Sequence, residues 1–175
     1  ILEDDVEFGT ELADFIAANG GALLASAATW DVCYLGFTQP VTPMRLLHRF
    51  PGTGAQYAVH GCYTTHAYIL QDTTYAWLLE RLPVQERIWP WLSRHRAIDR
   101  WYIRHLSRRF RVTALSPTLI GQFSDFSDIG QREPGADRAQ HLHTRVDASR
   151  VVEGRLRYLV AKWLRDLQFR IADAW

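Results

Sequence analysis

Three consecutive acids near the start of the chain, Glu3, Asp4 and Asp5, follow the apolar pair Ile1 and Leu2. Carboxylates at the end of a buried strand are costly unless a cation neutralises them, and hard divalent metals such as Mn²⁺ or Mg²⁺ prefer oxygen ligands. In an extended segment alternate side chains share a face, so we expect Glu3 and Asp5 to point one way and Asp4 the other. The residues predict a metal site, with a solvated turn before a following helix as the alternative.

The elements that must position these acids alternate between strand and helix patterns. An amphipathic helix is predicted over residues 11–19, ended by Gly20. The pattern predicts strands at 31–36 and 111–115, several more strands between 44 and 70 around a turn at 51–54, and helices at 73–82, 99–109 and 149–172. Strands that alternate with helices indicate an α/β architecture with a mixed sheet flanked by helices.

Composition and charge limit the class of protein. The 175 residues suit one domain with a full-sized core, and a formal net charge of +1 argues against nucleic acid as a partner. Cys33 and Cys62 lie in apolar stretches, so we expect buried free thiols in a reducing, cytoplasmic compartment rather than a disulfide. No run approaches the roughly twenty apolar residues that cross a bilayer. Because the chain starts without Met, we expect a fragment, and an upstream signal or anchor stays open.

The last predicted helix is amphipathic. Its apolar face carries Leu156, Leu159, Trp163 and Leu167, and basic residues lie beside this stripe. Two interpretations stay open for the stripe. The helix packs it against its own domain, or the helix makes a peripheral contact with an anionic membrane, which for a cytoplasmic protein is the inner face.

Five short segments between residues 1 and 130 carry a resemblance to known proteins. They are Ile-Leu-Glu-Asp-Asp-Val at 1–6, Trp-Asp-Val-Cys-Tyr-Leu-Gly at 30–36, Thr-His-Ala-Tyr-Ile-Leu at 65–70, Ile-Asp at 98–99, and Ser-Pro-Thr-Leu-Ile-Gly-Gln at 116–122 with Ser-Asp-Ile at 127–129. In this order they resemble family 25 glycosyltransferases, the enzymes of lipopolysaccharide biosynthesis and, in animals, of collagen galactosylation. The resemblance implies a GT-A-like fold whose N-terminal nucleotide-binding half is missing here. Residues 1–148 would be the acceptor and metal-site portion, and 149–175 a C-terminal amphipathic helix of the same domain.

The same resemblance implies roles for the acids. Asp5 would ligate the metal directly, Glu3 would contact the ribose or a metal-bound water, and Asp4 would support the donor site behind them. A metal neutralises the charge that develops on the departing diphosphate. Because the family inverts configuration, a base must take the proton of the acceptor hydroxyl. Asp99, at the start of a helix, is predicted to be this base, with a plain N-cap as the alternative.

Further candidates follow in the chain. Gln122 and Ser127 are predicted to bind the donor, or else to anchor a polar loop. Trp101 and Tyr102 are predicted to contact an acceptor sugar, or else to pack in the core. His66, inside a buried run, is expected to be a satisfied core histidine.

Two late histidines, His141 and His143, would share a face of an extended segment. One of them could complete the metal shell, as a late histidine does in some GT-A enzymes. A solvated pair in a polar loop is the alternative.

The function expected from the resemblance is metal-dependent, inverting transfer of a sugar such as galactose. The donor would be a nucleotide sugar of the UDP type, and the acceptor a glycan or glycolipid. Two other classes stay open: a non-catalytic carbohydrate-binding relative that lacks the nucleotide half, and a metal-dependent phosphoryl-transfer or hydrolytic enzyme built on the same acids.

Overall fold

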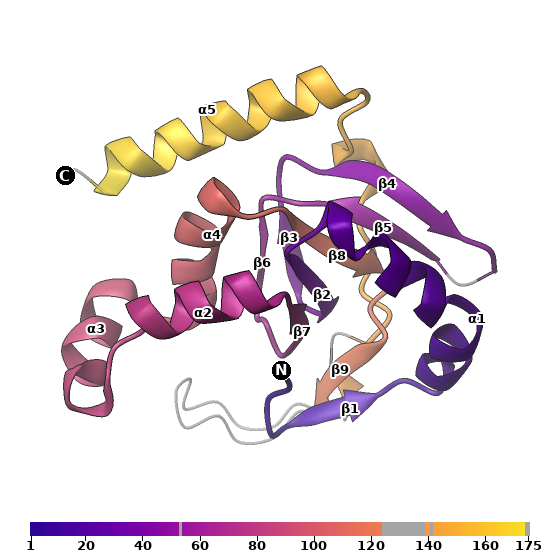
Figure 1. Ribbon diagram of the computed structural model, residues 1–175, viewed down its shortest axis with the longest axis horizontal. Helices are drawn as coiled ribbons and strands as arrows, with labels where there is room; N and C mark the ends of the chain where they lie inside the picture. Colours follow the sequence, from indigo (N-terminus) through magenta and orange to yellow (C-terminus); the bar gives the residue numbers. More distant parts are fainter. Residues whose placement is uncertain (53, 124–138, 141, 174–175) are drawn as a thin grey trace.

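The computed structural model describes residues 1–52, 54–123, 139–140 and 142–173 (Figure 1). Within this part of the chain the protein is a mixed α/β fold with five α-helices and a five-stranded mixed sheet. In spatial order the sheet consists of β4 (Arg45–Phe50), β5 (Gly54–Ala58), β8 (Val112–Ser116), β2 (Val32–Gly36) and β7 (Ala67–Leu70). β2 and β8 run parallel, and the other neighbours run antiparallel. The predicted α/β class with a mixed sheet is confirmed.

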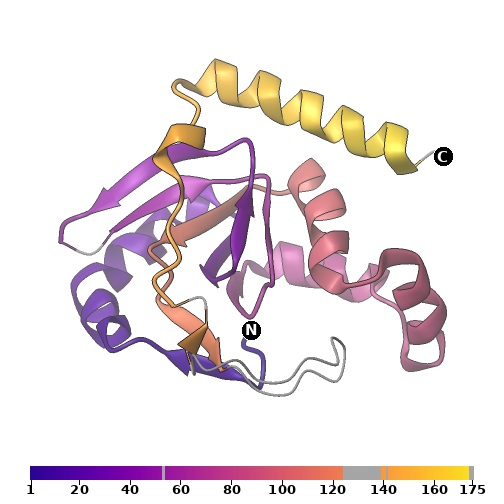
Figure 2. The same cartoon turned by 180° about the vertical axis from the view of Figure 1, so that it is seen from behind.

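Two smaller sheets and the helices surround the main sheet. β1 (Val6–Phe8), β9 (Ile120–Phe123) and β10 (Ala139–Gln140) form one antiparallel sheet, and β3 (Gln39–Val41) pairs with β6 (Gly61–Tyr63). The helices are α1 (Glu11–Ala25), α2 (Asp72–Arg81), α3 (Ile88–His95), α4 (Ile98–Arg109) and α5 (Arg155–Asp173). Both ribbon views place α2, α3 and α4 together on one side of the molecule and α1 on the other, while α5 runs along a third side (Figures 1 and 2).

The strands and helices predicted from local patterns lie close to the observed ones. The run at 31–36 is β2, whose first three residues have no exposed surface, and the segment at 44–70 contains β4 to β7. The predicted segments at 73–82, 99–109 and 111–115 correspond to α2, α4 and β8. Apolar runs of strand length are a local signal, so the sequence was sufficient for these elements.

α1 is longer than the sequence pattern predicted. The helix continues through Gly20 and Gly21 to Ala25 instead of ending at Gly20. Leu23, beyond both glycines, is 5% exposed and packs with Phe15 in the core. Burial of a leucine outweighs the cost of about 1 kcal/mol for each glycine inside a helix.

The region around α1 also meets a criterion that the sequence analysis did not expect. In the described part of the chain, the stretch Glu11–Thr29 is long and apolar enough to span a membrane, by length and composition only. Core helices and signal sequences can meet the same criterion, and here only a small part of the stretch, which includes Phe15 and Leu23, is buried. The stretch is therefore weak support for a membrane span.

Both cysteines are buried and free, as predicted. Burial raises the pKa of the Cys33 thiol to about 12, and it raises the pKa of the Cys62 thiol as well. Neutral, buried thiols of this kind act as small apolar core residues rather than as nucleophiles or metal ligands.

α5 differs from the prediction in its start and in its orientation. It begins at Arg155 rather than at 149, after a 3₁₀ turn at Ala148–Arg150 and Gly154 with φ 81°. The apolar stripe lies on one face, as predicted, but that face points outward: Leu156 is 75% exposed and Trp163 62% exposed. The interpretation in which the stripe packs against the domain is therefore wrong for Leu156 and Trp163, whereas Leu159, at the edge of the stripe, lines a cavity between α5 and the main sheet.

Candidate functional site

The amino-terminal acids are positioned by two successive pairings of the chain. Leu2 forms an antiparallel bridge with Ala67, and the Glu3 amide donates to the His66 carbonyl at 2.9 Å. After a turn, β1 pairs with β9 in a register that sets Val6 opposite Gln122. The chain therefore passes from the edge of the main sheet to the β1–β9 sheet (Figure 1). The acids lie in the segment that connects the two sheets.

Gln122 joins the two acids that were predicted to share a face. Its Nε2 donates to Glu3 Oε2 at 3.0 Å and lies 3.3 Å from both carboxylate oxygens of Asp5. The predicted same-side placement of Glu3 and Asp5 is confirmed by this shared donor. The segment is not extended as predicted, because Asp4 and Asp5 form a turn; the two carboxylates meet at the Gln122 amide, and Asp4 is exposed.

The electrostatics of the site centre on Glu3. Although part of its side chain reaches solvent, burial of the rest raises its pKa, and so do the charges of Asp5, Asp4 and Asp99, in decreasing order; the hydrogen bond from Gln122 acts the other way. Asp99 comes from α4, far along the chain. The fold thus brings the predicted metal ligands and the predicted base into one electrostatic neighbourhood.

Asp99 itself is held by two backbone amides. Its Oδ2 accepts from the Thr64 amide at 3.0 Å and its Oδ1 from the Arg100 amide at 2.6 Å. Thr64 has φ 53°, a left-handed conformation that turns its amide between β6 and β7. The plain N-cap alternative is wrong, because Ala97 occupies the N-cap position and Asp99 lies inside the first turn of α4. The carboxylate connects α4 to the β6–β7 loop.

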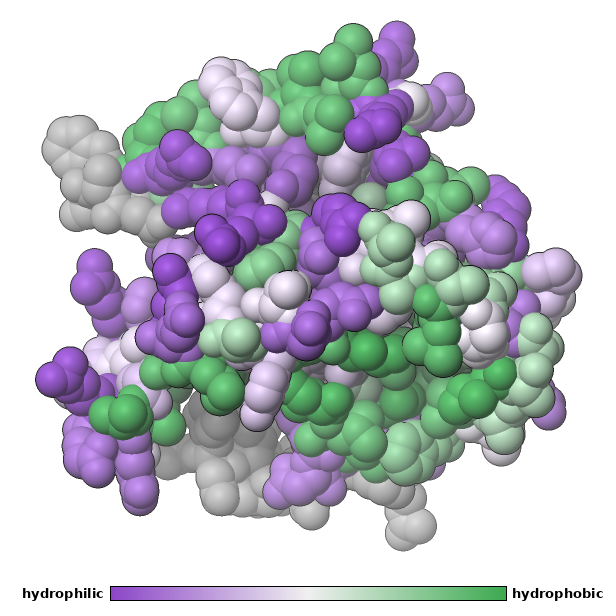
Figure 3. All heavy atoms as spheres, viewed as in Figure 1, coloured by the Kyte–Doolittle hydropathy of each residue, from purple (hydrophilic) through white to green (hydrophobic). Residues whose placement is uncertain are grey.

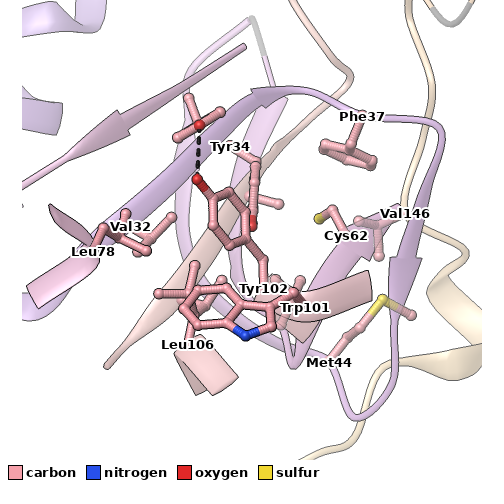
Figure 4. Packing of buried hydrophobic residues seen from close by; sticks show 14 residues of the cluster. Val32, Tyr34, Phe37, Met44, Cys62, Leu78, Trp101, Tyr102, Leu106 and Val146 are labelled. Carbon is pink, nitrogen blue, oxygen red and sulfur yellow. Dashed lines mark hydrogen bonds between the residues drawn. The ribbon is translucent and has the colours of Figure 1, made fainter. Parts of the chain in front are cut away.

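The predicted acceptor residues lie in the hydrophobic core. Trp101 is 6% exposed and Tyr102 3% exposed, and Figure 4 shows both rings inside the buried cluster. The Tyr102 hydroxyl lies 3.2 Å from the Tyr68 hydroxyl, and burial raises the pKa of both phenols. Neither Trp101 nor Tyr102 offers a ring face to a sugar here, so the predicted stacking gains no support. By contrast with these two buried rings, the side chain of Trp89 on α3 is 76% exposed.

The histidine predictions have different outcomes. His66 is wholly buried, with Nε2 2.9 Å from the Ile120 carbonyl oxygen, so its predicted place in the core is confirmed. His143 lies 3.8 Å from Glu11 Oε2, beside α1, rather than with the acids of the first segment. Ser127 and His141 lie outside the described residues.

The described residues supply only part of a metal-binding site. No group of three or more His, Cys, Asp or Glu side chains in the described part of the chain is arranged to hold a metal ion. Glu3 and Asp5 nevertheless supply two carboxylates around one amide. Mg²⁺ is commonly held by one or two carboxylates, with waters and substrate phosphates completing the shell. The donor set therefore suits a cation that is shared with a phosphate ligand.

A cavity of about 700 Å³ lies elsewhere in the molecule. It is bordered by α5, by the 3₁₀ turn Ser26–Thr29 that follows α1, and by residues of β4, β5 and β8. Arg45, His48, Gln56 and Lys162 are among its lining residues, whereas Glu3, Asp5 and Asp99 are not. The acids therefore do not line this cavity; Glu3 is exposed, and Asp5 and Asp99 are partly buried.

Sequence reasoning missed the groups that hold the acids in place. The Thr64 amide and the His66 carbonyl are backbone groups, and no side-chain pattern marks them. Tyr68 was not singled out, although its hydroxyl meets Tyr102 beneath the acids. The only sequence feature that could have indicated these groups is the turn at Thr64 and Thr65 between two strands.

Comparisons with known proteins add no relative. No family model, no curated protein and no solved structure matches this chain. The family 25 resemblance therefore rests on the five sequence segments alone.

Proposed function

We propose that this chain carries the metal and acceptor side of an inverting glycosyltransferase. The enzyme transfers a sugar from a UDP-type nucleotide sugar to a glycan or glycolipid, and galactose is the first sugar to test. One observation supports the proposal above the others: the Gln122 amide joins Glu3 to Asp5 while the charge of Asp99 acts on the same Glu3 carboxylate. This proximity of residues from three distant segments supports the proposal.

The acids divide the work of binding the donor. Asp5 and Glu3 would hold a divalent cation, Mn²⁺ or Mg²⁺, and the chemistry that this cation would supply is to offset the charge that develops on the departing diphosphate. The Gln122 amide would position the two carboxylates for this cation. Asp4, exposed beside them, faces the donor from the turn. The two carboxylates leave room for diphosphate oxygens in the metal shell.

Asp99 takes the proton of the acceptor hydroxyl. The hydroxyl oxygen attacks the anomeric carbon, the bond from that carbon to the diphosphate breaks, and the proton passes to the carboxylate. The amides of Thr64 and Arg100 fix the direction of the carboxyl group. An ionised carboxylate has about four lone-pair sites, so two bound amides leave capacity for the proton.

The finer fold assignment belongs to the same proposal. A GT-A-like domain has a nucleotide-binding α/β half before its acidic motif, and this chain would supply the part that follows. The described mixed sheet with the acids at its edge is compatible with that division. Residues 1–148 form the acceptor and metal portion in this scheme, and 149–175 its terminal helix.

Turnover of nucleotide sugars tests the proposal. The chain is incubated with Mn²⁺ and a panel of UDP-sugars with glycan and glycolipid acceptors, and released UDP is measured. We expect release that depends on Mn²⁺ and falls at least about a hundredfold in Asp99→Asn, because general-base catalysis contributes 10²–10⁴-fold. Asp14→Asn, an exposed acid on α1, serves as the control and should keep full activity. Equal turnover in both variants would exclude Asp99 as the base.

A non-catalytic carbohydrate-binding relative is the second candidate. Both Asp99 oxygens already accept backbone amides, and this arrangement also suits a purely structural residue. Such a protein would bind glycans without Mn²⁺ and release no UDP. Binding that is unchanged by Asp5→Asn, together with absent turnover, would favour this second candidate.

A further inference from the structure

The outer face of α5 is an unpartnered apolar surface. Seven large apolar side chains on this one helix are between 39% and 75% exposed; they are Leu156, Leu159, Val160, Trp163, Leu164, Leu167 and Ile171. At 100° per residue they fall within an arc of about 140°. Figure 3 shows hydrophobic residues gathered over α5 at the top of the view. A contiguous surface of this kind marks an interaction site in a folded protein.

The opposite face of α5 is polar and holds the helix to the domain. The Lys162 ammonium donates to the Ser107 carbonyl oxygen and pairs with Asp166 at 3.9 Å. The Tyr158 hydroxyl donates to the Val59 carbonyl oxygen at 3.5 Å. Rolling the helix to bury its apolar stripe would break these contacts, so the stripe is available for a separate partner.

The charges beside the stripe have one sign. At 100° per residue, Arg157 borders the stripe and Arg170 falls within its arc near the end of α5. Both are exposed, as is Arg155, which also lines the cavity beneath α5, while Asp166 is half-buried against Lys162. Among the described side chains of the helix, the exposed charges are therefore cationic. An apolar stripe that contains a tryptophan and is bordered by arginines is complementary to a surface with anionic head groups and an apolar interior.

We propose that α5 docks this protein onto an anionic lipid membrane. The helix lies flat in the interface, with Trp163 and its apolar neighbours among the acyl chains and the arginines at the head groups. A second copy of the chain fits less well. In an isologous contact the arginine-bearing ends of the two stripes would face arginines in either helix direction, and like charges repel. The surface is separate from the acids, so this interaction does not depend on the proposed transfer.

Vesicle co-sedimentation tests the proposal. The chain is mixed with vesicles of phosphatidylcholine alone or of phosphatidylcholine with phosphatidylglycerol. We expect binding to the anionic vesicles that weakens as salt is added. The double variant Trp163→Glu, Leu167→Glu should lower the partition coefficient at least about tenfold, because binding scales with buried apolar area. Both side chains are exposed, so the variant should keep its melting temperature.

Two further variants make the result decisive. Ile16→Glu changes an apolar side chain on α1 that is 58% exposed, and it should bind vesicles like the wild type. Arg155→Gln with Arg157→Gln should weaken binding to anionic vesicles while binding to neutral ones stays as it was. Absence of vesicle binding, or equal binding by the Trp163 and Ile16 variants, would overturn the proposal. A wild-type dimer in light scattering that Trp163→Glu converts to a monomer would assign the face to a second copy instead.

Discussion

The acids near the start of the chain repel each other in the folded protein. Burial and the charges of Asp5, Asp4 and Asp99 raise the pKa of Glu3. Because the folded-state pKa of this acid lies above its ordinary value, ionised Glu3 lowers stability, and the loss grows as pH rises through the folded-state pKa. Functional sites often carry such a cost, since the charges are arranged for a ligand. A bound cation would remove it.

A buried histidine gives the first prediction. His60 has no exposed surface and lies 3.1 Å from Ser107 Oγ; burial, followed by the charges of Lys162 and Arg165, lowers its pKa to about 3. The folded state therefore disfavours imidazolium, and its stability should fall as pH drops from the ordinary histidine pKa toward 3. The slope approaches about 1.4 kcal/mol per pH unit.

Denaturant unfolding at several pH values checks this. The stability advantage of the wild type over His60→Gln should be full at neutral pH and shrink as the solution is acidified. His48→Gln, at an exposed site on β4, is the control and should follow the wild type throughout. A difference between wild type and His60→Gln that does not change with pH would contradict the account.

The helices and strands differ in how far the sequence determines them. β2 and β8 were predicted because their apolar runs are local. α1 was predicted too short, since tertiary burial of Leu23 overrides two glycines. The proximity of Glu3 and Asp5 was predicted from the period of an extended chain, but the structure has a turn at Asp4 and Asp5, so the reason given for it was wrong. The Gln122 contact was not predicted, because it depends on the pairing of β1 with β9 across the length of the chain.

At Gly36, β2 lies very close to the His66 ring and to the backbone at Ile120. A Cβ at Gly36 would lie 2.3 Å from the His66 ring and 2.6 Å from the Ile120 carbonyl oxygen. The carbonyl is backbone and cannot turn away as a side chain could. Gly36→Ala should therefore destabilise the protein by about 2 kcal/mol or more, measured by denaturant unfolding.

Gly21→Ala is the matched control for this substitution. A Cβ at Gly21 meets no atom within 4 Å, and the residue lies inside α1. Alanine is the better helix former, so this change should stabilise the protein by about 0.5–1 kcal/mol. Similar effects of the two substitutions would show that the close approach at Gly36 is not real.

At the scale of the whole molecule, we propose separate roles for two surfaces of one α/β domain. The acids lie where the chain passes from the main sheet to β1, and the apolar stripe of α5 lies along another side (Figure 1). The sequence predicted both groups of residues but not their surroundings. For Trp101 and Tyr102 it left contact with an acceptor and packing in the core both open, and the fold buries them. Aromatic residues alone do not reveal which rings the core requires.

Thermal unfolding with added Mn²⁺ tests the central claim, that Glu3 and Asp5 share a divalent cation. A ligand that binds only the folded state stabilises it by RT ln(1 + [L]/Kd), about 1.4 kcal/mol at ten times Kd. We predict a melting temperature that rises by several degrees with Mn²⁺ in the wild type and in Asp14→Asn, and stays constant in Asp5→Asn. The same rise in Asp5→Asn as in the wild type, or no rise in any of the three proteins, would contradict the account.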